Sequence, residues 1–257
     1  MNRKVSVAVV GLLVLVFLGL GIPAIMRWRT LAERTRCEDH MRVVAVRTSE
    51  YVQREKAFPP GTVFAKDRPP DKRLSWVVLL LPMLGHPEQA KQIDRSQPWD
   101  ADVNRRPGSV LIKSLVCPSL IDATMAGGYG ALHYPGIAGV GSGAARRDRS
   151  DPYAGIFGYD APTPVEAVKD GSSNVLLLLE TTRNIGPWIA GGPTSVRGVD
   201  PNEQPYLGEG RPFGGAHRGG ANAAFADGRC QFLSDKISPT VLEMLSAMAD
   251  GNSPPEP

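Results

Sequence analysis

The chain has 257 residues, a net charge of +3 and 42% hydrophobic residues, which suits one sizeable folded domain with short appendages. Its 28 Gly and 23 Pro indicate many turns and long loops, and therefore a β-rich body. The basic residues are scattered rather than gathered in a patch, which argues against a nucleic-acid partner. The sequence contains no CxxC, no HExxH and no Cys/His cluster at zinc spacing, so no metal or other cofactor is predicted.

Residues 5–26 form a 22-residue run without a charged side chain. As a helix this run is about 33 Å long, which suffices for the ~30 Å hydrocarbon core of a bilayer. A cleaved signal peptide is the alternative, but its apolar stretch is only about 7–15 residues long and ends in a small-x-small cleavage site. We predict an uncleaved single-pass anchor over residues 1–26, with the lipid bilayer as the partner of residues 5–26.

Charge alone leaves the orientation of this anchor open. Two basic residues precede the apolar run and four follow it closely (Arg3 and Lys4; Arg27, Arg29, Arg34 and Arg36). The positive-inside rule alone favours a cytoplasmic C-terminal side. The cysteines and the family resemblance described below favour the opposite arrangement, with a cytoplasmic N-terminus and the C-terminal domain outside the cytoplasm.

Beyond the anchor, the sequence has the pattern of an amphipathic stem helix over residues 27–57. One helical face carries Cys37, Met41, Val44, Thr48 and Tyr51. The sequence FPPG at 58–61 ends the helix, because Pro cannot donate a hydrogen bond and Gly permits the turn. We predict that anchor and stem form one helix of about 50 residues. Two helices broken at Pro23 are the alternative.

Residues 58–249 are predicted to form an extracytoplasmic domain of helices and strands. Residues 74–85 (LSWVVLLLPMLG) are too few to cross a bilayer and predict a buried helix. Strands are predicted within 109–119, 155–160 and 169–182. The last of these follows Asp-Gly turn chemistry with a continuous apolar run, which is typical of a buried strand.

The C-terminal third combines a long loop with a hairpin and a short helix. Of the 32 residues in 184–215, 13 are Gly or Pro, which indicates a functional surface loop or disorder. Residues 222–233 place an Asp-Gly pair between apolar runs, the strongest short-range hairpin signal. A Ser-Pro pair starts a helix over 238–248, and residues 250–257 predict a disordered tail. This order predicts an α+β fold with an antiparallel sheet packed on the N-terminal helix.

Seven sequence pieces occur in this order: IPAIMRWRTLAERTRCEDHMRVV, FPPG, SWVVLLLPML, PWDADVN, VCPS, VKDGSSNVLLLLE and HRGGANAAFADG. In the last piece, nine residues separate His217 from Asp227-Gly228, an H-X9-DG motif. With these pieces the chain resembles a pilin-like family of unknown function (DUF1559-type) whose members carry a prepilin-type N-terminal helix. The resemblance covers Pro23 to Asp250. It implies a long helix packed on a β-sheet outside the cytoplasm, as in type IV pilins and type II secretion pseudopilins.

One departure from this pattern concerns the prepilin signal. Proteins of this kind often begin with Gly-Phe-Thr-Leu-x-Glu, whose acid pairs with a neighbouring subunit's amine in lipid. Met1 to Met26 contain no Glu or Asp, and the first acidic residue is Glu33. The missing carboxylate argues against prepilin-peptidase processing and against filament assembly through that pair. We therefore expect a permanently anchored monomer or a minor component rather than a major pilin.

His217, Asp227, Glu180 and Asn222 form a candidate polar cluster. Imidazole and carboxylate groups suit a divalent cation or a polar ligand. The alternative is structural, with His217 bonded to loop backbone and Asp227 making the hairpin turn. In that case Glu180 ends a strand and Asn222 bonds the backbone of a neighbouring loop. We favour this alternative, so no catalytic, metal-binding or cofactor-binding residue is predicted.

Two of the three cysteines, Cys37 and Cys117, lie in segments that match the family and would both face outside. A disulfide between them would tie the stem helix to the sheet. Closing this 80-residue loop would contribute roughly 4 kcal/mol in the chain-entropy account. Two buried thiols are the alternative, and Cys230 is predicted to be a small core residue.

Three functions follow as hypotheses. The first is a structural or interaction role for a membrane-anchored, pilin-like envelope protein, with secretion or pilus-like assembly components as partners. The second is an anchored binding module that takes a solute, glycan or Ca²⁺ through residues 184–215. A hydrolase is disfavoured, because no catalytic spacing is present. Residues 139–145 (GVGSGAA) match neither phosphate-loop pattern and are predicted to be a loop.

Overall fold

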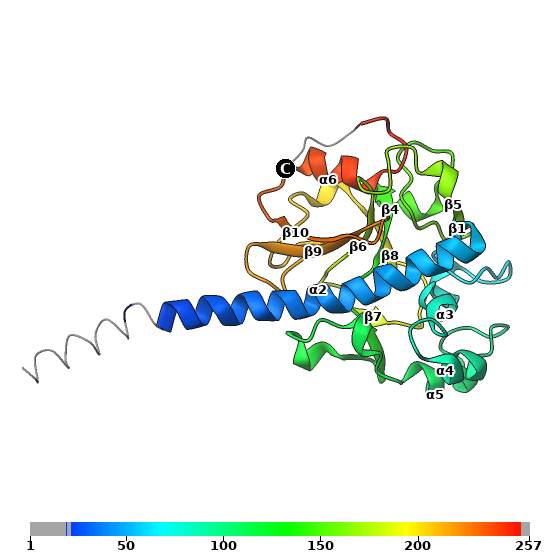
Figure 1. Ribbon diagram of the computed structural model, residues 1–257. Coiled ribbons are helices and arrows are strands. Elements are labelled where there is room, and N and C mark those ends of the chain that lie inside the picture. The colour runs from blue at the N-terminus through cyan, green and yellow to red at the C-terminus, as the bar shows by residue number, and fades with distance from the viewer. Residues whose placement is uncertain (1–18, 20–21, 253–257) are drawn as a thin grey trace, which may run out of the picture.

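A computed structural model describes Gly19 and residues 22–252 of the chain (Figure 1). Most of the anchor predicted over residues 1–26 lies outside these residues. Across the described part of the chain, no helix is both long and apolar enough to cross a membrane. The helices are α2 (Ile22–Glu55), α3 (Val77–Leu80), α4 (Pro87–Gln92), α5 (Asp102–Gly108) and α6 (Pro239–Ser246). The strands are β1 (Ala57–Phe58), β2 (Met125–Ala126), β3 (Tyr129–Leu132), β4 (Gly136–Val140), β5 (Thr163–Pro164), β6 (Leu176–Leu179), β7 (Gly186–Pro187), β8 (Val196–Val199), β9 (Gly220–Phe225) and β10 (Cys230–Ser234).

The 34-residue helix α2 has two parts that differ in exposure. Its C-terminal part buries the face predicted from sequence except Tyr51, which is half-buried, and the buried residues are Cys37, Met41, Val44, Ala45 and Thr48. Its N-terminal part, residues 22–36, is exposed apart from the half-buried Arg34 and projects away from the domain (Figure 1). The helix ends at Glu55, three residues before Phe58. The next residue, Lys56, adopts a left-handed conformation (φ 57°), and its N–H donates to the carbonyl of Val52.

A five-stranded sheet in the order β10-β9-β6-β4-β8 forms the centre of the domain. The prediction of an antiparallel sheet is wrong at one edge, because β4 and β8 pair in parallel, with Gly136 opposite Val196. The long connection from β6 to β8 passes β4 and places β8 on the far edge of β4, running in the same direction. Parallel neighbours require such a crossover, whereas the tight hairpin β9–β10 produces antiparallel ones.

This sheet lies between α2 on one face and α6 on the other (Figure 1). Strand β6 shows why its sequence is continuously apolar. Leu177 and Leu178 belong to the core beneath α2, whereas Leu176 and Leu179 belong to the core beneath α6. A strand buried on both faces needs no polar alternation. The prediction of a buried strand within 169–182 is therefore confirmed.

The local signals at the C-terminal end are also confirmed. Strands β9 and β10 form the predicted hairpin, and the Asp227-Gly228 pair occupies its turn with Gly228 at φ 89°. Helix α6 starts at Pro239 directly after Ser238, although the Ser238 side chain makes no capping hydrogen bond. At the end of the described chain, the backbone N–H groups of Asp250 and Gly251 donate to Asp170.

Two strand predictions are wrong. Within 109–119 the chain forms the 3-10 turn η3 (Lys113–Leu115), which packs on α2. Within 155–160 the backbone follows β4 without forming a regular strand, because Gly139 of β4 has φ +109° and breaks the ladder. The buried helix predicted over 74–85 is helical only at Val77–Leu80, since Pro82 has no N–H to continue the helical hydrogen bonds.

Candidate functional site

Four side chains with metal-ligand chemistry meet beneath the stem helix, although they lie far apart in the sequence. Cys37 comes from α2, Cys117 follows η3, Glu180 follows β6 and His217 precedes β9. All four are buried, and their ligand atoms lie within 4.8 Å of one another. We call these four residues the stem cluster.

Cys37 and Cys117 form a disulfide across a sequence separation of 80 residues. Cys37 is the first buried residue of α2, so the bond fixes the helix where it enters the domain. Two hydrogen bonds support the same junction. His40 Nδ1 donates to the Val116 carbonyl (2.8 Å), and the Tyr134 hydroxyl donates to the Cys37 carbonyl (3.2 Å).

The backbone of Cys117 is held by the buried side chain of His133. The Cys117 N–H donates to His133 Nδ1 (2.9 Å), so His133 Nε2 carries the proton and donates to the Ala123 carbonyl (2.8 Å). This arrangement requires a neutral imidazole. Burial lowers the pKa of His133 and favours the same neutral form.

Glu180 is a fully buried carboxylate directly after β6. Its backbone is tied to two neighbouring segments, since its N–H donates to the Asn222 carbonyl (3.0 Å) and its carbonyl accepts from Gly214 N–H (2.7 Å). Its Oε2 accepts from the Asn222 N–H (3.2 Å). Its Oε1 has no hydrogen-bond partner among the described residues and lies 3.4 Å from His217 Nε2.

His217 is positioned by a glycine-rich approach to β9. Gly219 has φ +90°, a conformation that side chains disfavour. A Cβ on Gly220 would lie 1.9 Å from the Leu233 carbonyl oxygen, so only glycine allows this approach. His217 Nε2 then lies 3.5 Å from Cys117 Sγ and 3.4 Å from Glu180 Oε1. The imidazole therefore faces the disulfide and the carboxylate.

Asn222 connects the hairpin to the stem helix. Its Nδ2 donates to the Arg34 carbonyl (3.4 Å), whereas its Oδ1 has no hydrogen-bond partner in the described structure. The guanidinium of Arg34 lies over the ring of Phe232 on β10, 4.4 Å from the ring centroid. The half-buried Arg34 thus contacts both strands of the hairpin.

Asp227, the remaining member of the predicted polar cluster, is not part of the stem cluster. It lies in the turn at the opposite end of β9, where its Oδ1 accepts from the Arg229 N–H (2.9 Å). The H-X9-DG motif therefore marks the two ends of one strand. What the sequence interpretation missed is that the cysteine pair and the His217–Glu180 pair form a single cluster. All four residues are of types that bind metals, which was the available signal. Their spacing in the sequence did not indicate that they meet in the fold.

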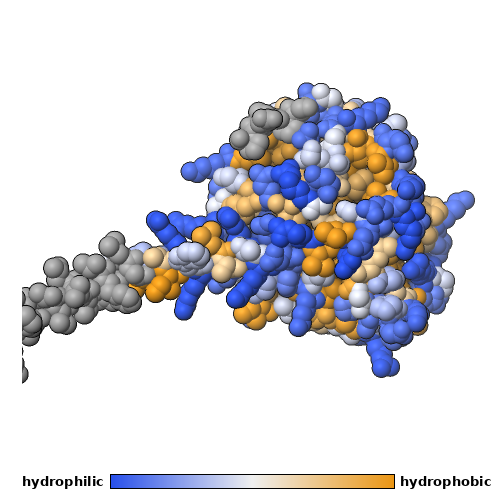
Figure 2. Space-filling view, in the orientation of Figure 1, coloured by the Kyte–Doolittle hydropathy of each residue, from blue (hydrophilic) through white to orange (hydrophobic). Residues whose placement is uncertain are grey.

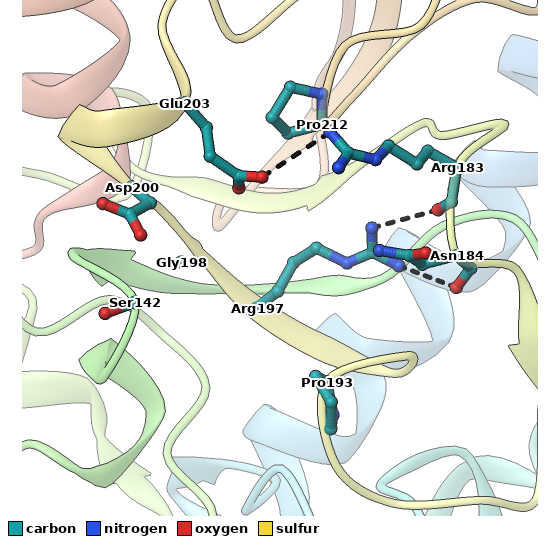
Figure 3. Close-up of a pocket in the computed structure, with 9 residues that line it drawn as sticks. All are labelled: Ser142, Arg183, Asn184, Pro193, Arg197, Gly198, Asp200, Glu203 and Pro212. Carbon is teal, nitrogen blue, oxygen red and sulfur yellow. Dashed lines mark hydrogen bonds and ion pairs between the residues drawn. The ribbon is translucent and has the colours of Figure 1, made fainter.

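The second candidate site is a polar cavity of about 180 Å³ formed mainly by residues 183–212 (Figure 3). Arg183 pairs with Glu203 across it (3.5 Å), and Arg197 donates to the carbonyls of Arg183 and Asn184 (both 3.1 Å). Ser142 and Asp200 also line the cavity. Its walls thus present cations and carboxylates together, which suits a small polar ligand.

Arg197 is the most constrained group of this cavity. Burial lowers its pKa to about 10, and its Nε is buried without a hydrogen-bond partner among the described residues. The guanidinium also lies 5.8 Å from the centroid of the Phe213 ring. It remains charged at neutral pH, so the cavity keeps a positive group.

The fold and these two sites define an α+β domain on a protruding N-terminal helix, with a disulfide and a His–Glu pair at the junction. A family model described as "protein of unknown function (DUF1559)" matches residues 27–240, and the chain belongs to this family. No curated protein and no solved structure matches the chain. The family description supplies no activity.

Proposed function

We propose that the protein is a membrane-anchored, pilin-like envelope protein with a structural or interaction role. In this proposal residues 5–26 hold the chain in the bilayer, and the domain lies outside the cytoplasm. The observation that carries it is the protruding part of α2, which continues the apolar run and leaves the domain without packing on it. Figure 2 shows hydrophilic and hydrophobic residues adjacent to one another along this part.

The protruding residues have the composition of a membrane–water boundary. Trp28 is 74% exposed and Met26 is 64% exposed, although both are large and apolar. Arg27 and Arg29 flank Trp28. Tryptophan and basic side chains concentrate at the headgroup level, where an amphipathic ring or a long stem has one end in lipid and one in water. Trp28 therefore supports a bilayer surface close to this turn of α2.

The disulfide and the helix-on-sheet arrangement support the remaining parts of the proposal. Disulfides persist in oxidising compartments, so the Cys37–Cys117 bond favours a domain outside the cytoplasm. The packing of α2 on β9 and β10 agrees with the long helix and sheet that the pilin resemblance implies. The partners that fit this role are components of a secretion or pilus-like assembly.

The anchor is tested by cell fractionation of Leu12→Arg/Leu15→Arg against wild type. Each arginine in a membrane-spanning helix opposes insertion by about 2.5–3.5 kcal/mol. We expect wild type in the detergent-extractable membrane fraction and the double variant released from it. Val46→Arg, at a position 44% exposed on the domain side of α2, is the matched control and should remain in the membrane fraction. A wild-type chain recovered without detergent would contradict the anchor.

The interaction role is tested by a photo-crosslinking residue placed at Trp28 in living cells. We expect crosslinks to secretion or pilus components from this position. Ile121 is 77% exposed on the domain and serves as the control position, from which these crosslinks should be absent. An equal yield of protein crosslinks from both positions, or none from Trp28, would contradict a role for the protruding helix.

The cavity of Figure 3 favours a second candidate function, an anchored module that binds a small polar solute, glycan or Ca²⁺. A ligand that binds only the folded state raises the melting temperature by mass action. We expect one sugar or divalent cation to raise the melting temperature of the full chain in detergent. Arg197→Met should abolish a shift caused by a sugar or another polar solute, whereas Arg211→Met, at an exposed position outside the cavity lining, should retain it. A screen without any shift would contradict binding.

A further inference from the structure

We propose that the stem cluster is a Zn²⁺ site in the dithiol form of the protein. The four ligands are Cys37, Cys117, Glu180 and His217. This inference goes beyond the proposed function and does not depend on anchoring or on a partner protein. It assigns two exclusive states to one place in the fold, a disulfide state and a zinc dithiolate state.

The donor set fits zinc better than other common cations. Zn²⁺ takes four ligands in tetrahedral geometry from thiolate, imidazole and carboxylate groups. Ca²⁺ and Mg²⁺ require six or more oxygen ligands, and the stem cluster offers one carboxylate. All four side chains are buried, so their charges need a partner of opposite sign inside the protein.

The existing distances already match part of a tetrahedral site. With bonds of about 2.0 Å to nitrogen and oxygen and about 2.3 Å to sulfur, tetrahedral edges are about 3.5 Å for N···S and about 3.3 Å for N···O. His217 Nε2 lies 3.5 Å from Cys117 Sγ and 3.4 Å from Glu180 Oε1. Two of the three distances among His217, Cys117 and Glu180 therefore already match the edges of a tetrahedral site.

Glu180 provides the strongest single observation. Its Oε1 is buried and has no hydrogen-bond partner among the described residues, which destabilises a carboxylate in a protein interior. The Asn222 N–H holds Oε2, which leaves Oε1 directed at the cluster. A cation bound between His217 and the sulfurs would satisfy this oxygen. Asn222 would then act as the group that orients a metal ligand.

The largest change is that the two sulfurs must separate. A disulfide holds them at about 2.05 Å, whereas two thiolates on zinc lie about 3.8 Å apart. A dithiol reductant supplies two electrons and two protons to the Cys37–Cys117 bond and leaves as its own disulfide. Zn²⁺ then displaces the two thiol protons to solvent. The zinc state therefore belongs to the chain before its disulfide forms or after a dithiol has reduced it.

The experiment uses the full-length chain, reduced with a dithiol, refolded by dilution with one equivalent of Zn²⁺ and desalted. We expect one zinc per chain, a higher melting temperature than the reduced metal-free chain, and protection of Cys37 and Cys117 from alkylation. Cys230 is the internal control, because it lies outside the stem cluster and should be alkylated equally with and without zinc. Co²⁺ in place of Zn²⁺ should give thiolate-to-metal absorption of a tetrahedral site.

Matched variants separate this site from zinc held by two thiols alone. Glu180→Gln and His217→Gln keep both cysteines and should weaken zinc binding at least about tenfold. Asp227→Asn changes the motif carboxylate outside the cluster and should bind as wild type. Circular dichroism checks that each variant folds. Binding unchanged in Glu180→Gln and His217→Gln, zinc retained equally by the disulfide form, or no zinc in the reduced chain would each overturn the proposal.

Discussion

The side-chain amide of Asn222 donates to the backbone carbonyl of Arg34 across 188 residues of sequence, at a distance of 3.4 Å. Asn222 is fully buried on β9, whereas Arg34 lies near the point where α2 leaves the domain. The C-terminal hairpin therefore contacts the stem helix by a polar group as well as by packing. The same residue holds Glu180 through its backbone N–H.

Asn222→Ala should lower the free energy of unfolding by about 1–2 kcal/mol, because it removes the hydrogen bond to Arg34 and leaves a small void. Urea denaturation of the oxidised chain measures this change. Asn202→Ala is the matched control, since Asn202 is exposed and its side chain bonds to nearby Asp200. Its effect should stay within about 0.5 kcal/mol. Equal losses in the two variants would show that the Asn222 contact contributes nothing.

Met41→Ala should lower the free energy of unfolding by about 2–5 kcal/mol, since Met41 is fully buried between α2 and the sheet. Val43→Ala removes a side chain that is 43% exposed on the same helix and should change stability by less than about 0.5 kcal/mol. Thermal or urea unfolding of both variants tests the contrast. A small loss for Met41→Ala would mean that α2 is not part of the cooperative core.

Gly219, directly before β9, and Gly220, the first residue of β9, should differ in their tolerance of alanine. At Gly220 a Cβ would meet the Leu233 carbonyl oxygen at 1.9 Å, so Gly220→Ala must displace backbone and should lose more than about 2 kcal/mol. At Gly219 the added Cβ meets nothing within 4 Å, and only the φ of +90° is unfavourable. Gly219→Ala should lose about 1–2 kcal/mol. The reverse order in urea denaturation would contradict the close approach of β9 and β10.

The Cys230 thiol should react slowly with alkylating reagents in the folded protein. Burial raises the pKa of Cys230 to about 11, above the ordinary value of about 8.5. Because a raised thiol pKa means less thiolate at a given pH, and the higher nucleophilicity of such a thiolate offsets only part of this, alkylation at about pH 8 should be at least about tenfold slower than in the unfolded chain. The rate should rise about tenfold per pH unit up to about pH 11. In urea it should level off above about pH 8.5.

A plateau near the ordinary pKa in the folded protein would contradict the raised pKa of the half-buried Cys230 thiol. Mass spectrometry of the modified peptide provides the measurement. It also separates Cys230 from Cys37 and Cys117, which are joined in the disulfide. The oxidised chain is therefore used throughout the pH series.

The parts of the fold that local chemistry determines were predictable from sequence. The stem face of α2 follows helical periodicity, and β6 follows a turn signal and an apolar run. Strand β4 was missed because its Gly-rich sequence, GIAGV, has low strand propensity. Its glycines are required by tertiary contacts. A Cβ at Gly136 would lie 2.4 Å from the Phe157 ring, which no local pattern reveals.

The candidate site also has a part that was predictable from sequence and a part that depends on tertiary contacts. Candidate residues were identified by type, and Glu180, His217 and Asn222 do lie together. The sequence could not place Cys117 beside His217, because 100 residues separate them and the contact depends on how β6 and β9 pair. Ligand chemistry alone places Asp227 in the same candidate cluster as His217. A strand of this length carries the two residues to opposite ends of the sheet.

The disulfide at Cys37 also determines how the domain would respond to mechanical load. A force applied along the protruding part of α2 reaches the first buried turn and meets a covalent bond there. The disulfide transmits part of this force to the loop after η3. Met41, Val44 and Thr48 therefore do not separate from the sheet one helical turn at a time. Without the disulfide, α2 would separate from the sheet progressively under the same force, starting at its first buried turn.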